Sequence, residues 1–144
     1  MILGRVEDVI AFLEALETLR RENPQRLRHL SQIVPIEKNF SFTLSNFTDR
    51  LREIIAPYAE EIENNSTFYI RVRRRGHKGE ISSLEVEHEM DTFILETLER
   101  AGKQARISFE EPDRIIIIET IENRAGIGLI TREMKERYSF IRVK

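Results

Sequence analysis

Residues 67–78 carry the densest basic charge in the chain, with five basic side chains and no acidic one. An arginine guanidinium matches the geometry of a phosphate and stacks on nucleobases, and the glycines at 76 and 79 let a ligand approach the backbone. This composition fits contact with a nucleic acid. The alternative, equally open at this point, is a structural strand whose arginines pair with acidic residues at 79–122. The candidate contact residues of the segment are Arg71, Arg73, Arg74, Arg75, His77 and Lys78.

The remaining charge is distributed unevenly, although the 144-residue chain has a net charge of only −2. Residues 79–122 hold four basic and twelve acidic side chains, whereas residues 123–144 hold six basic and two acidic ones. A fold that brings the two basic segments together would create a basic face that the net charge conceals. We therefore expect the candidate surface to extend to four further cations, namely Lys103, Arg132, Lys135 and Arg137.

Other kinds of chemistry find little support. The chain has no cysteine, which excludes disulfides, thiolate metal sites and a cysteine nucleophile. Glu87 and Asp91 lie one helical turn apart and could hold a cation, but acidic residues also stabilise a helix start without any ligand. Gly126 and Gly128 do not extend into a phosphate-binding loop and favour close backbone packing. No spacing arranges a nucleophile beside a base, so we predict no catalytic residue, no metal, no cofactor and no enzymatic activity of the chain alone.

Helices are expected where apolar residues recur every three or four positions. One such pattern covers residues 6–23 and another covers 45–62, where Pro57 should kink or divide the helix because it lacks a backbone donor. Ser82 begins a capping box at the start of a long third helix, and Gly102 suits its C-terminal cap. A last, short helix is expected over 131–138.

Strands alternate with these helices. Residues 67–74 alternate apolar and polar side chains, which places the aliphatic residues on one face of a strand and the arginines on the other. The aliphatic run at 115–118 predicts a central strand covered on both faces. Residues 30–42 are expected to form an edge strand or two short strands, because Pro35 lies near the middle of the segment. Further extended segments are expected at 105–109, at 126–130 and at 140–143. This order, with 40% hydrophobic and 33% charged residues, predicts an α/β (α+β) protein.

Several of these segments occur in an order found in a known family. They are the arginine-bearing segment 68–77, then Ser82, Ser83 and Glu87, then Pro112 and Asp113 before the aliphatic run, and finally the segment 126–129. This ordered set resembles the THUMP domain, and the likeness covers residues 45–144. Within the family it is most similar to the standalone THUMP proteins that assist the tRNA cytidine acetyltransferase.

The resemblance implies a domain organisation. Residues 45–144 would form a THUMP domain with a mixed, largely parallel sheet packed by helices, and residues 1–44 would form the small ferredoxin-like domain that precedes it in the family. That domain normally opens with a strand, whereas only residues 1–4 precede the first helix here, so we expect it to be shortened. Because open sheet edges tend to pair with other strands, a homodimer is a reasonable expectation.

The resemblance also implies a function. In the family, THUMP carries no chemistry and holds the acceptor stem and single-stranded 3′ end of tRNA for a modifying enzyme, which here would be a separate protein. We expect that partner to be a cytidine acetyltransferase that forms N4-acetylcytidine. The alternative is a protein-interaction subunit of an RNA-modification complex that does not itself bind RNA. No apolar stretch approaches the roughly 18 residues of a membrane span, and no signal peptide is recognisable, so we expect a cytoplasmic protein with no membrane partner.

Overall fold

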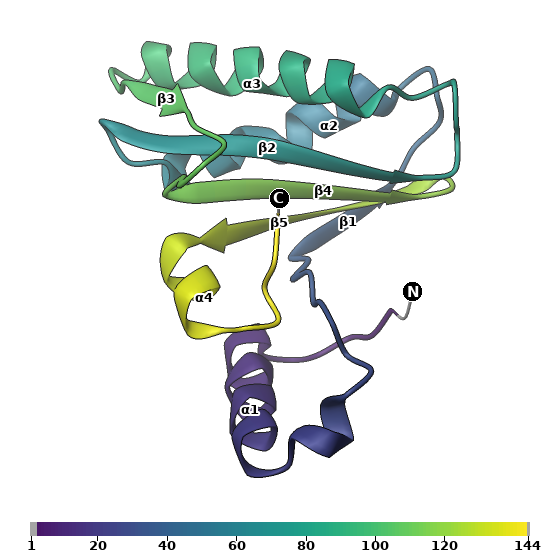
Figure 1. The fold of residues 1–144 in the computed structure, drawn as a ribbon. Coiled ribbons are helices and arrows are strands. Elements are labelled where there is room, and N and C mark those ends of the chain that lie inside the picture. The colour runs from purple at the N-terminus through teal and green to yellow at the C-terminus, as the bar shows by residue number, and fades with distance from the viewer. Residues whose placement is uncertain (1–2, 144) are drawn as a thin grey trace.

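The computed structural model of the protein describes residues 3–143 (Figure 1). Helices and strands alternate in this range, as the sequence predicted for an α+β fold. Their order is α1 (Val9–Glu22), η1 (Pro24–Leu27), β1 (Lys38–Ser41), α2 (Phe47–Ile55), η2 (Ala56–Glu61), β2 (Ser66–Arg75), α3 (Ser83–Arg100), β3 (Ala105–Ile107), β4 (Arg114–Ile121), β5 (Arg124–Thr131) and α4 (Arg132–Arg137), where η1 and η2 are 3-10 helices. In Figure 1, α2 and α3 lie above the sheet, and α4 and α1 lie below it. No helix in the described range is both long enough and apolar enough to cross a membrane.

The five strands form one sheet in the order β1-β5-β4-β2-β3. β2 runs parallel to both β4 and β3, whereas β5 runs antiparallel to both β4 and β1. The sheet is therefore mixed, as predicted, but the expectation of a largely parallel sheet is wrong. The reason is the two-residue turn at Glu122 and Asn123, because so short a connection can only reverse the chain into an antiparallel hairpin.

The upper core lies between the sheet and α2 and α3. The Oγ atom of Ser82 accepts a hydrogen bond from the backbone N–H of Glu85, which confirms the predicted start of α3. The buried residues of α3 face the aliphatic side chains of β2 in one cluster. The second helix ends at Ile55 and continues as η2 around Pro57, which confirms the predicted division.

A second, smaller core lies below the sheet. Tyr69 of β2 and Ile117 of β4 pack there against Leu13 of α1 and against Ile141 in the segment after α4. The isoleucines at 115–118 are at most 1% exposed, which confirms a central strand covered on both faces. Residues 140–143 belong to no strand of the described sheet and are anchored instead by a hydrogen bond from the Ile33 backbone N–H to the Phe140 carbonyl.

The described part of the first 44 residues contains α1, η1 and the edge strand β1. The extended segment predicted within 30–42 forms this one strand only, after Pro35. Residues 35 and 36 cross below β5. The Pro35 carbonyl lies where a side chain of residue 128 would begin, and the Ile36 side chain lies where one of residue 126 would begin. The close packing predicted for these two glycines is therefore confirmed. A domain boundary between residues 44 and 45 stays a prediction.

Candidate nucleic-acid interface

The basic segment forms the second half of β2 and the loop that follows it. Phe68, Ile70 and Val72 point into the upper core, so the alternating arginines point to the lower face of the sheet, as predicted. Arg74 is the exception, since it shares the upper face and its Nη1 atom donates to the Gly76 carbonyl at 2.9 Å.

Four arginines share the lower face along β2 and β3, and we call them the basic strip. Arg71 and Arg73 keep 34% and 28% of their side chains exposed, and Arg75 is exposed as well. Arg106 of β3 pairs in register with Thr67, two positions before Tyr69, and therefore lies on the same face. Successive arginines of β2 are about 6.6 Å apart along the strand, because each residue advances it by about 3.3 Å. The strip comprises Arg71, Arg73, Arg75 and Arg106.

Two arginines of the strip form ion pairs with carboxylates that are largely buried. Arg71 lies 3.7 Å from Glu87 of α3 and stacks over the Tyr69 ring at 5.5 Å, and Arg73 lies 3.7 Å from Glu119 of β4. The two glutamates are only 13% and 12% exposed, so the carboxylates lie inside while the guanidinium groups reach solvent. Arg71 and Arg73 thus form the ion pairs that the alternative of a purely structural strand expects. Each guanidinium group has five N–H donors, so these ion pairs still leave donors free to bind an anion.

Glu87 and Asp91 cover the open edge of β2, because β3 pairs only with its first three residues. The Val72 backbone N–H donates to Glu87 Oε1 at 2.9 Å. Burial, together with the nearby Glu87 charge, raises the pKa of Asp91 to about 6. In residues 3–143, no cluster of three or more acidic or histidine side chains is arranged to hold a metal ion.

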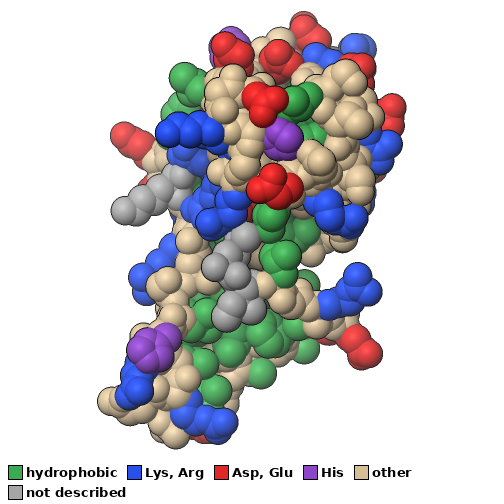
Figure 2. Space-filling view, turned by 90° about the vertical axis from the view of Figure 1, so that its right-hand side faces the viewer, with side chains coloured by type: hydrophobic (Ala, Val, Ile, Leu, Met, Phe, Trp, Pro, Cys, Tyr) green, Lys and Arg blue, Asp and Glu red, His purple; other side chains and the backbone are tan. Residues whose placement is uncertain are grey.

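The loop after β2 combines a fixed histidine with an exposed lysine. His77 adopts a left-handed backbone conformation (φ 52°), its Nε2 atom lies 2.8 Å from Asn123 Oδ1, and its ring lies 5.9 Å from that of Phe42. Lys78 is exposed. Figure 2, which faces this end of the sheet, shows side chains of both charge signs interleaved here and hydrophobic side chains gathered below, towards α1.

Lys103 and Arg132 lie at the opposite end of β2 from Arg75, about 30 Å along the strand. The Lys103 ammonium group donates to the Ile62 carbonyl at 3.0 Å, at the end of η2 and away from the strip. Arg132 lies 3.1 Å from Asp113 Oδ1 and donates to the Glu111 carbonyl, which places it beside the loop at 108–113. Arg132 therefore borders the far end of the strip, and Lys103 does not.

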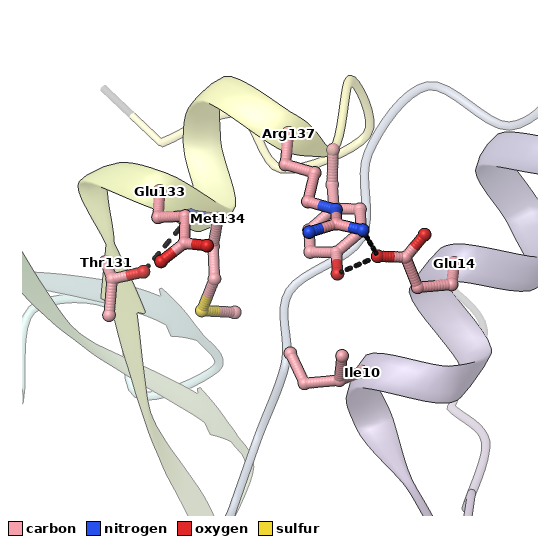
Figure 3. Close-up of a pocket in the computed structure, with 7 residues that line it drawn as sticks. Ile10, Glu14, Thr131, Glu133, Met134 and Arg137 are labelled. Carbon is pink, nitrogen blue, oxygen red and sulfur yellow. Dashed lines mark hydrogen bonds and ion pairs between the residues drawn. The ribbon is translucent and has the colours of Figure 1, made fainter.

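The remaining predicted residues, Lys135 and Arg137, lie on α4. The Arg137 guanidinium and the Tyr138 hydroxyl both bind Glu14 Oε1, at 2.5 and 2.9 Å, and so join α4 to α1 beside a cavity of about 290 Å³ (Figure 3). The strand β4 separates β5 from β2, so the two basic segments of the sequence do not form one continuous face. A role of Lys103, Lys135 and Arg137 in binding stays a prediction.

Two residues of this face were missed in the sequence. Arg106 alternates with Ala105 and Ile107, a pattern that could have placed it opposite the aliphatic side chains. The sequence predicts a strand through Phe109, but β3 ends at Ile107. Its ring is consequently 67% exposed and lies 5.5 Å from that of Tyr69, at the end of the strip. An exposed aromatic ring beside arginines is suited to stack on an unpaired base.

The fold and the strip together define an α+β domain with a basic sheet face. A family model described as the THUMP domain matches residues 43–130, and the chain belongs to this family. THUMP domains are generally tRNA-binding domains of tRNA-modification enzymes. A search of curated proteins finds no match.

Solved structures are similar to this chain at low sequence identity. A 4-thiouridine synthetase in complex with RNA and ATP is 15% identical with a TM-score of 0.50, over 90% of this chain and 39% of that one. PH1313 from Pyrococcus horikoshii Ot3 is 18% identical (TM-score 0.47, 65% and 31% covered), and TrmN from Thermus thermophilus is 19% identical (TM-score 0.48, 65% and 27% covered). The chain thus spans about a third of the length of these proteins.

Proposed function

We propose that this chain is a non-enzymatic tRNA-binding protein that holds the acceptor stem and 3′ end of tRNA for a modification enzyme. The observation that carries the proposal is the basic strip on the lower face of the sheet, with the exposed ring of Phe109 at its end. The strip would contact the sugar-phosphate backbone and the ring would stack on an unpaired base of the 3′ end. Phosphate contacts make binding strongly dependent on salt, whereas stacking depends little on it.

The partner enzyme in this proposal is a separate cytidine acetyltransferase that forms N4-acetylcytidine. Its support is the ordered set of motifs that resembles the standalone THUMP adaptors. In the same proposal, residues 1–44 are a shortened ferredoxin-like domain. The edge strand β1 offers an open edge at which a second copy could pair to form a homodimer.

Binding of intact tRNA and of the same tRNA with a trimmed 3′ end, over a series of salt concentrations, tests the proposal. The variant Arg71→Ala/Arg73→Ala should lower affinity by about tenfold or more and reduce the salt slope by about two, since each lost phosphate contact reduces it by about one. Arg52→Ala/Arg100→Ala removes the same charge from the helical layer and should change both quantities little.

Three results bear on the proposal. Tighter binding of the intact tRNA than of the tRNA with a trimmed 3′ end supports recognition of the acceptor end. Equal binding of both tRNAs would reject that recognition, and no tRNA binding would reject the proposal as a whole.

The ion pairs at Arg71 and Arg73 favour one alternative, a protein-interaction subunit whose basic strand meets an acidic partner. Arg71 and Arg73 already pair with carboxylates of this chain, and carboxylates of a partner protein could pair with the exposed parts of the same arginines. Capture of the purified enzyme partner that survives treatment with RNase, together with absence of direct tRNA binding, would support the alternative.

A further inference from the structure

Glu119 is the one acidic residue of β4, where it directly follows the run of four isoleucines. In the register of the sheet it lies between Arg73 of β2 and Gly126 of β5. The proposed function makes no direct use of this carboxylate, whose side chain is only 12% exposed.

The ion pair that Glu119 forms within the described residues lies on its β2 side. On the β5 side, Gly126 has no side chain, and Ile36 packs over it at the place of the missing Cβ atom. On the β2 side, Arg73 Nη1 lies 3.7 Å from Glu119 Oε1. Burial raises the pKa of Glu119, although Arg73 and Arg75 act in the opposite direction. A buried carboxylate with one such contact costs stability through desolvation, so folding alone does not explain it.

We infer that Glu119 is a positioning residue that holds the Arg73 guanidinium in the orientation in which it binds a phosphate. This inference rests on the proposed function. An arginine side chain loses much rotational freedom when it binds, and a partner that fixes it beforehand reduces that loss. The guanidinium group has five N–H donors, so a contact with Glu119 from inside leaves the outer ones available.

The variant Glu119→Gln separates positioning from simple electrostatics, because the two predict effects of opposite sign. Removal of a negative charge beside the strip should tighten binding of tRNA if only the net charge matters. Loss of positioning should weaken it by about 3- to 10-fold, the effect of one side chain that must be ordered on binding. Glu110→Gln makes the same charge change on an exposed side chain near Phe109 and should not weaken binding.

A double-mutant cycle identifies the group through which Glu119 acts. In an Arg73→Ala background, Glu119→Gln should have no further effect on affinity, whereas a general structural role would still lower it. Glu119→Asp keeps the charge and should recover part of the lost affinity. In thermal unfolding, Glu119→Gln should be at least as stable as the wild type, because the charge that it removes costs stability through desolvation.

The outcomes separate the two proposals. If the wild type binds tRNA and Glu119→Gln binds equally well or more tightly, the positioning role is wrong and the proposed function stands. If Glu119→Gln does not fold, Glu119→Asp is compared with the unchanged Glu119 instead, in the wild-type background and in the Arg73→Ala background. The inference would be overturned if Glu119→Asp leaves the affinity for tRNA unchanged in both backgrounds. If the wild type binds no tRNA, both proposals are wrong.

Discussion

Asp113 and Thr67 tie the beginning of β4 to the beginning of β2. Asp113 Oδ2 accepts hydrogen bonds from the Thr67 backbone N–H at 2.9 Å and from its hydroxyl at 3.2 Å, and the Asp113 N–H donates back to the Thr67 carbonyl at 3.0 Å. These contacts stand immediately before the first paired residues, Phe68 and Arg114. The register that begins there brings Arg73 beside Glu119 five residues further on.

Replacement of Asp113 with asparagine should lower the free energy of unfolding at pH 7 by about 1–2 kcal/mol, since hydrogen bonds to a charged acceptor are lost. Urea unfolding measures this change. Asp49→Asn, on an exposed side chain of α2, serves as the control and should change stability by less than about 0.5 kcal/mol. An equal effect of both substitutions would contradict the role of Asp113.

The same carboxylate should make stability dependent on acid. The hydrogen bond from the Thr67 backbone lowers the pKa of Asp113 below its ordinary value of 3.8. A lowered pKa means that the ionised form stabilises the fold, so this contribution is complete well above pH 4 and is lost as the pH falls through the folded-state pKa. The difference in stability between the wild type and Asp113→Asn should therefore shrink below pH 4. A constant difference from pH 7 to pH 3 would reject this explanation.

Asp91 should show the opposite dependence on pH. Its folded-state pKa, about 6, lies above the ordinary value of 3.8, so the fold loses stability as the pH rises through this window. Asp91→Asn should raise the free energy of unfolding at pH 7.5 by on the order of 1 kcal/mol, allowing for solvent screening, and change it little near pH 4. Unfolding curves at the two pH values test this, and a gain of the same size at both would contradict it.

Gly128→Ala should destabilise the protein by about 1–3 kcal/mol, because the new Cβ atom would collide with the Pro35 carbonyl. Backbone atoms cannot rotate aside as a long side chain can, so the segment below β5 would have to move. Thermal unfolding measures the effect. Gly4→Ala is the matched control, since nothing lies within 4 Å of its added carbon, and comparable losses in both variants would rule out the collision as the cause.

Phe109→Ala should weaken binding of tRNA with an intact 3′ end by about tenfold, the effect of one stacked base, and leave the salt slope unchanged. The ring is exposed, so its removal should leave the melting temperature close to that of the wild type. Leu84→Ala removes a similarly exposed apolar side chain at the start of α3 and serves as the control. A reduced salt slope for Phe109→Ala would indicate that the substitution disturbs the strip instead of removing a stacking contact.

Local patterns predicted most elements of this fold. The cap at Ser82, the division of the second helix at Pro57 and the burial of the isoleucines at 115–118 each follow from chemistry within a few residues. The misjudged segments were those whose ends depend on a distant neighbour. The strand expected at 105–109 ends at Ile107, because β2 pairs with only three of its residues, and this leaves Phe109 outside the sheet.

The same distinction applies to the candidate site. Alternation along β2 determined by itself that Arg71 and Arg73 oppose the aliphatic side chains, because successive residues of a strand point to opposite faces. Only the tertiary structure decided which residues lie next to Arg71 and Arg73 on that face of the sheet. Register between strands depends on contacts between segments far apart in the sequence. It placed Glu119 beside Arg73, and it placed Arg106 on the same face as Arg71 and Arg73.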